Sequence, residues 1–173
     1  QQLVNKRVLG YLSWRFNRRH IHSPEILGAL IRDMDGVRAN HLVISGDLTQ
    51  IGTPSEYKQV GNWLVALGAP SEISVIPGNH DSYVRNDFSQ TTSHWSAYMD
   101  SDANLSSTTP FPSLRQRGPL AIIGLSTALP TAPFFATGKL GQAQIDALTR
   151  LLDSTGKQGL FRVVVLHHGP LVD

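Results

Sequence analysis

Acidic, amide and imidazole side chains in this sequence come directly after short apolar runs. Asp47 follows one such run, Asn79 and His80 follow a second, and His167 and His168 follow a third. Carboxylate and amide oxygens and imidazole nitrogens are good ligands for divalent ions such as Zn, Mn and Fe. Sites in open α/β sheets form at the carboxyl ends of strands. We therefore expect these side chains to converge on one metal site.

The same residues have a simpler interpretation when each is taken alone. Asp47, Asn79 and His80 are residue types that often occupy turns and caps. Their joint position after apolar runs, beside Gly46 and Gly78, favours the metal site, because glycine lets the backbone turn sharply there.

The elements that must position these side chains can be predicted from the pattern of apolar residues. Helices are expected after the capping signals at residues 23–25 and 53–56, and again around residues 140–152. Four apolar runs predict strands at residues 42–44, 73–76, 120–125 and 161–166. Because strands alternate with helices and are apolar throughout, we predict an α/β domain whose sheet is covered on both faces.

The polar stretch at residues 82–113 has no clear pattern, and we expect one helix near residues 92–99. Arg115 and Arg117 follow this stretch. We interpret them as residues of a solvated loop, with a phosphate contact as the second possibility.

Together the motifs resemble those of the calcineurin-like metallophosphoesterase superfamily. They are Gly46-Asp47, the tetrapeptide Gly78-Asn79-His80-Asp81, and the His167-His168 pair. The pattern is most similar to that of bacterial cyclic-nucleotide and glycerophosphodiester phosphodiesterases. The resemblance implies a four-layer αββα sandwich that binds two divalent metal ions, which would be Mn, Fe or Zn.

The resemblance also implies ligand roles. Asp47 would bridge both metals, and Asn79 would bind the second metal through its amide oxygen. One histidine of the pair would complete that site. We favour His167 because it comes first after the strand, whereas ligation, substrate contact and a structural role stay open for His168.

The reaction implied by the resemblance is hydrolysis of a phosphoester, and of a diester more than a monoester. A hydroxide activated by two metals would attack the phosphorus, and His80 would act as general acid toward the leaving oxygen. Asp81 would support this site by accepting hydrogen bonds from the loop that carries His80.

Two motifs of the superfamily have no counterpart here. No Asp-x-His occurs near the start, and the residues up to Asp173 contain no Gly-His-x-His. We therefore expect residues 1–173 to be one incomplete domain, made of a basic segment at 1–22 and a core at 23–173. We also expect this chain alone to be weakly active or inactive.

Composition narrows the remaining possibilities. The 173 residues contain no cysteine, which excludes a thiolate nucleophile and a cysteine zinc site. No apolar run is long enough to span a membrane, and we expect a cytoplasmic protein. The segment 1–22 holds five basic residues and no acidic one, with Leu9, Leu12 and Trp14 among them.

A small phosphoester is the expected substrate. Nucleic acid is a second candidate, because a basic segment attracts phosphates, but it is not favoured. Membrane contact through the apolar residues of segment 1–22 is not favoured either, and the segment is expected to be a solvated loop or to pack on its own domain.

The motifs are also compatible with a nuclease or a phosphomonoesterase of the same superfamily, and with a scaffold that has the same fold and no activity. Retention of His80 argues against the scaffold, because the resemblance implies that members of the superfamily without catalysis tend to lose this histidine. The sequence does not predict an oligomeric state.

Overall fold

The computed structural model describes residues 6–16, 23–37, 39–84, 93–102, 110–131 and 135–170. The helices among them are α1 (Lys6–Phe16), α2 (Pro24–Val37), α3 (Pro54–Leu67) and α5 (Gln142–Lys157), with a 3-10 turn η2 (Ser96–Tyr98). The strands are β1 (Leu42–Ile44), β2 (Ile73–Val75), β3 (Ser113–Arg117), β4 (Leu120–Gly124) and β5 (Phe161–Val165). None of these helices has the length and apolar character needed to cross a membrane.

The described strands form two sheets. In the first, β1 and β2 are parallel, with Leu42 opposite Ile73. In the second, β4 is central, antiparallel to β3 and parallel to β5. The predicted strand at residues 42–44 is confirmed as β1, and the other three predictions are confirmed with ends that differ by at most one residue.

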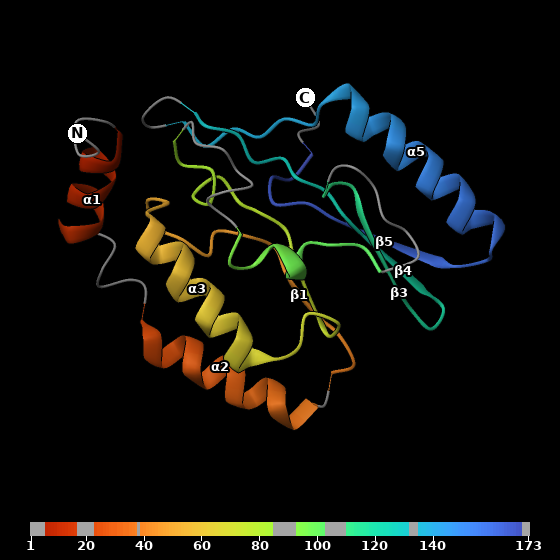
Figure 1. Ribbon diagram of the computed structural model, residues 1–173, viewed down its shortest axis with the longest axis horizontal. Coiled ribbons are helices and arrows are strands. Elements are labelled where there is room, and N and C mark those ends of the chain that lie inside the picture. Colours follow the sequence, from red (N-terminus) through yellow and green to blue (C-terminus); the bar gives the residue numbers. More distant parts are fainter. Residues whose placement is uncertain are drawn as a thin grey trace.

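Two clusters of buried apolar side chains hold the layers together. The larger cluster joins α3 and β2 to Trp95 and Phe111, and Val165 of β5 packs against it, so it lies between the two sheets. The smaller cluster joins Leu114, Ala121 and Ile123 of the second sheet to leucines of α5. Figure 1 shows α2 and α3 on one side of the strands and α5 on the other. The predicted α/β class and the order helix, sheet, sheet, helix are thus confirmed.

Coverage of the sheets is less complete than the apolar runs predicted. Strand β2 is buried along its whole length, but Phe161 and Val164 of β5 are exposed. Among the described strands β5 lies at the edge of its sheet, and α5 contacts β5 without covering Phe161 and Val164.

Strand β3 corrects the interpretation of Arg115 and Arg117. Both lie in this strand and not in a solvated loop. Arg115 is buried and donates to the carbonyl oxygen of Ala97 at 3.0 Å, and Arg117 forms an ion pair with Asp102 at 2.9 Å. Each of the two guanidinium groups therefore contacts protein groups.

The helix predicted near residues 92–99 is reduced to the single 3-10 turn η2, and residue 92 lies outside the described residues.

The basic N-terminal segment is helical over Lys6–Phe16, and the remainder of residues 1–22 lies outside the described residues. The solvated-loop interpretation is wrong for this stretch. Arg7 of α1 is buried. Its Nε donates to the carbonyl oxygen of Ile51 at 3.0 Å, and its guanidinium group also donates to the carbonyl oxygen of Gly52.

Candidate functional site

The turn after β1 gives Asp47 an unusual backbone. Gly46 has φ of 101° and Asp47 has φ of 59°, so both residues occupy the left-handed region. Glycine adopts this region freely, and aspartate is one of the few other residues that tolerate it. The turn directs one carboxylate oxygen of Asp47, Oδ1, toward the loop after β2, where it accepts a hydrogen bond from the backbone N–H of His80 at 3.0 Å.

Asp81 joins this turn to the loop after β2. Its side chain is completely buried and accepts hydrogen bonds from the backbone N–H groups of Asp47, Thr49 and Gly78, each at 2.8 Å. The hydroxyl of Thr49 donates to the same carboxylate at 3.1 Å. Burial raises the pKa of Asp81, and the hydrogen bonds from Gly78 and Thr49 oppose that rise. One carboxylate therefore fixes the backbones of both loops.

His167, after β5, completes the arrangement. Its Nε2 lies 3.3 Å from Oδ1 of Asn79 and 3.5 Å from Oδ1 of Asp47. Its Nδ1 lies 2.7 Å from the carbonyl oxygen of Ser45. Because a carbonyl can only accept, Nδ1 carries the ring proton of a neutral imidazole, and Nε2 presents a lone pair.

With His167 neutral, three lone-pair atoms lie close together, because Nε2 of His167 is 3.5 Å from Oδ1 of Asp47 and 3.3 Å from Oδ1 of Asn79. Such atoms repel unless a cation or a proton lies between them. A histidine that donates its other nitrogen to a backbone carbonyl is the usual arrangement of a metal ligand. The donor set of two oxygens and one nitrogen fits a divalent transition-metal ion.

Gly78 allows these groups to approach. A Cβ at this position would overlap Oδ1 and the backbone nitrogen of Asp47, and it would lie 2.8 Å from Cε1 of His167. Within the part of the chain that the structure describes, no group of three or more His, Cys, Asp and Glu side chains could hold a metal. A metal at this position therefore depends on the amide oxygen of Asn79.

His80 lies beside this cluster with its own fixed orientation. Its Nδ1 lies 2.6 Å from the carbonyl oxygen of Gln50, so Nδ1 donates to this oxygen. The ring of Tyr83 packs against it with centroids 5.6 Å apart.

His168 is held apart from the three lone-pair atoms. Its Nδ1 lies 2.7 Å from the hydroxyl oxygen of Thr127, and its Nε2 is buried with no hydrogen-bond partner among the described residues. Burial and the neighbouring His167 lower the pKa of His168, while Asp47 opposes the change. The two histidine rings meet edge to face at 4.8 Å. His168 thus packs behind His167 and does not face Asn79 in the way that His167 does.

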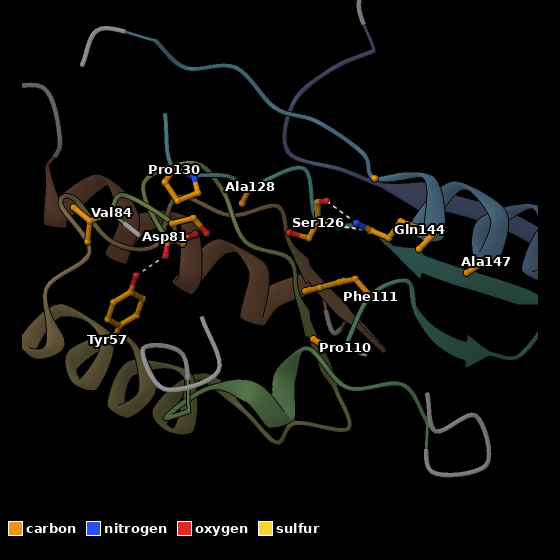
Figure 2. A pocket seen from close by; sticks show the side chains of 13 residues that line it. Tyr57, Asp81, Val84, Pro110, Phe111, Ser126, Ala128, Pro130, Gln144 and Ala147 are labelled. Atoms are coloured by element: carbon orange, nitrogen blue, oxygen red, sulfur yellow. Dashed lines mark hydrogen bonds between the residues drawn. The ribbon is translucent and has the colours of Figure 1, made fainter. Parts of the chain in front are cut away.

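A separate cavity of about 480 Å³ has Asp81 in its lining. Figure 2 shows Tyr57, Asp81 and Val84 on one side of it and Ser126 and Gln144 on the other. Its described lining includes neither Asp47, Asn79 and His80 nor the two histidines after β5.

Several supporting residues could not be found from the sequence. Thr49 and Thr127 resemble ordinary loop threonines, and Ser45 and Gln50 contribute only backbone carbonyls. The one available signal was position, because Thr49 follows Asp47 by two residues.

Comparison with known proteins agrees with this geometry. A family model described as calcineurin-like phosphoesterase matches residues 20–172, a range that contains each residue of the cluster. A search of curated proteins finds no match to the chain. Because the family match spans most of its length, this chain belongs to the calcineurin-like phosphoesterase family, whose members hydrolyse phosphoester bonds with the help of divalent metal ions.

Proposed function

We propose that the chain hydrolyses phosphodiesters, with Asp47, Asn79 and His167 holding a divalent ion that is Mn, Fe or Zn. The observation that carries the proposal is the meeting of three lone-pair atoms after three different strands, with Nδ1 of His167 already donating to Ser45. When bound, the ion would supply a Lewis acid for a phosphoryl oxygen. A second ion, which the family pattern implies, would share Asp47.

His80 is the proposed general acid. With Nδ1 donating to Gln50, a protonated His80 carries its second proton on Nε2, and this atom can donate to the leaving oxygen. An alkoxide is a poor leaving group, so protonation lowers the barrier by an amount typical of general acids, about 10²–10⁴-fold in rate. The hydrogen bond from the backbone of His80 to Asp47 keeps this acid beside the proposed metal.

Asp81 and His168 have positioning roles in this proposal. Asp81 sets the distance between the two loops through its three backbone hydrogen bonds. The ring of His168 packs edge to face against the ring of His167, and a hydrogen bond between Nδ1 and the hydroxyl of Thr127 orients His168.

Preference for a diester is tested by comparing bis(p-nitrophenyl) phosphate with p-nitrophenyl phosphate in the presence of Mn²⁺. We expect a higher kcat/KM for the diester and slow absolute turnover, because the described residues converge on a single ion position. Faster hydrolysis of the monoester would contradict the phosphodiesterase proposal while leaving the metal site in place. EDTA is expected to abolish hydrolysis, and hydrolysis that survives EDTA would contradict the metal dependence.

A further inference from the structure

Helix α1 has one face attached to the domain. Arg7 is buried and donates to the carbonyl oxygens of Ile51 and Gly52. One turn further along, a Cβ at Gly10 would overlap the hydroxyl of Tyr83, so the helix backbone lies directly on that side chain. At 100° per residue, Arg7 and Gly10 lie on the same side of the helix.

The opposite side of α1 is apolar and faces solvent. Leu9, Leu12 and Phe16 are 48%, 43% and 73% exposed. Their spacing of three and four residues places them on one stripe, nearly opposite Arg7 and Gly10. A helix that packs on its own domain normally buries its apolar stripe, whereas α1 buries an arginine and leaves three large apolar side chains in water.

The charge around this stripe is of one sign. Segment 1–22 contains no acidic residue, and besides the buried Arg7 it holds Lys6, Arg15, Arg18 and Arg19. A helix with an exposed apolar stripe and basic flanks is typical of segments that lie in the interface of an anionic bilayer. A nucleic acid would match the charge but not the apolar stripe, so the combination favours lipid.

We propose that α1 docks on an anionic lipid bilayer, with Leu9, Leu12 and Phe16 entering the headgroup region. Arg15, which is exposed on α1, would face the lipid phosphates. Tyr83, which contacts α1 at Gly10, also packs against His80. If the proposed function holds, docking therefore brings the loop of the general acid to the membrane surface, where amphiphilic phosphoesters are available.

Co-sedimentation with vesicles tests this docking, and EDTA in the buffer makes the result independent of the metal site. The vesicles contain equal parts of phosphatidylglycerol and phosphatidylcholine, and pure phosphatidylcholine vesicles serve for comparison. We expect the protein to bind the anionic vesicles at least about tenfold more tightly than the neutral ones, because the basic segment supplies much of the attraction.

Leu12→Glu should reduce binding to anionic vesicles about tenfold or more, because it places a charge at the centre of the stripe. Val65→Glu is the matched control, since Val65 on α3 is 71% exposed and lies outside this stripe. Phe16→Glu repeats the test near the end of α1 if circular dichroism shows that Leu12→Glu unfolds. Unchanged binding of either folded stripe variant would overturn the proposal, and so would absence of binding by the unaltered protein. Self-association that Leu12→Glu abolishes, without vesicle binding, would assign the stripe to a second copy of the chain instead.

Discussion

The glycine between Pro77 and Asn79 determines how closely the site can assemble. Gly78 does not need an unusual φ, but its missing Cβ leaves room for the carboxylate of Asp47 and the ring of His167. A cluster of lone-pair atoms therefore depends on a residue that contributes no ligand.

Replacing Gly78 with alanine should push Asp47 and His167 apart. We expect Gly78→Ala to weaken Mn²⁺ binding and to lower the free energy of unfolding by about 1–3 kcal/mol, as is typical of overpacking. Gly36→Ala is the control, because a Cβ at Gly36 would meet nothing within 4 Å. Calorimetry and urea denaturation measure the two effects, and an unchanged Mn²⁺ affinity of Gly78→Ala would show that the close approach is not required.

His80 should be separable from the metal ligands by mutation. His80→Asn is expected to reduce kcat by about 10²–10⁴-fold while the amount of bound metal stays the same, because the side chain donates a proton and binds no ion. His94→Asn, at an exposed histidine, should leave both quantities unchanged. Loss of metal from His80→Asn would assign His80 to ligation instead.

Much of the candidate site follows from the sequence, because Asp47, Asn79 and His167 each come directly after a strand. The tautomer of His167 does not follow from it, since it depends on the carbonyl of Ser45, which is 122 residues away in the chain. The hydrogen bond of His168 does not follow from the sequence either, because its partner Thr127 comes after β4 whereas His168 comes after β5.

At the scale of elements, helix α3 is the best-specified part of the fold. The predicted capping box is confirmed, because the side chain of Thr53 accepts from the backbone of Glu56 and the side chain of Glu56 accepts from the backbone of Thr53. Glu56 also accepts a hydrogen bond from the backbone N–H of Gln50, whose carbonyl oxygen contacts Nδ1 of His80. The cap of α3 is therefore connected to His80 through Gln50.

Removing this cap should destabilise the domain. Thr53→Ala is expected to lower the free energy of unfolding by about 1 kcal/mol, because an N–H of the first turn of α3 loses its acceptor. Thr149→Ala in the middle of α5 is the control, since alanine favours a helix interior and the hydroxyl there only donates back to Ile145. Equal unfolding free energies for Thr53→Ala and the unaltered protein, measured in urea, would show that the cap contributes nothing.

Strand β3 shows where prediction from pattern fails. Its sequence, Ser-Leu-Arg-Gln-Arg, has one apolar residue in five, and a strand is normally recognised by apolar or alternating residues. It becomes a strand because β4 offers a full antiparallel edge and because Asp102 and Ala97 give the buried Arg115 an ion pair and a hydrogen bond. Partners of this kind are distant in the chain and leave no local signal.

For the whole molecule, Arg117 connects the two sheets. It pairs with Asp102 at 2.9 Å, and its guanidinium also donates to the carbonyl oxygen of Ser71 at 2.6 Å and to Nδ1 of His41 at 3.1 Å. His41 and Ser71 precede the strands of the first sheet, whereas Arg117 ends a strand of the second. The cluster therefore closes the end of the sandwich opposite the candidate site.

This cluster should make stability depend on pH. Burial alone would raise the pKa of Asp102, but the hydrogen bonds from Arg117 and Gln116 and the charges of Arg117 and Arg115 outweigh burial and lower that pKa below its ordinary value of 3.8. A lowered pKa in the folded state stabilises the protein above pH 3.8, and this contribution is lost as the pH falls below that value through the folded pKa.

The difference in unfolding free energy between the unaltered protein and Asp102→Asn should therefore shrink between about pH 6 and about pH 2. Asp153→Asn removes an exposed ion pair with Lys157 and should change little at any pH. A pH-independent difference for Asp102→Asn, measured by urea denaturation, would show that the charge of Asp102 is not what stabilises the cluster.

The central claim is that Asp47, Asn79 and His167 together bind a divalent ion, and Mn²⁺ titration calorimetry tests it most directly. Alanine at any of the three should weaken binding by more than about 100-fold, whereas His168→Ala should cost about 10–100-fold, the range of a residue that only positions a ligand. Full Mn²⁺ affinity in His167→Ala, or a greater loss in His168→Ala than in His167→Ala, would contradict the account.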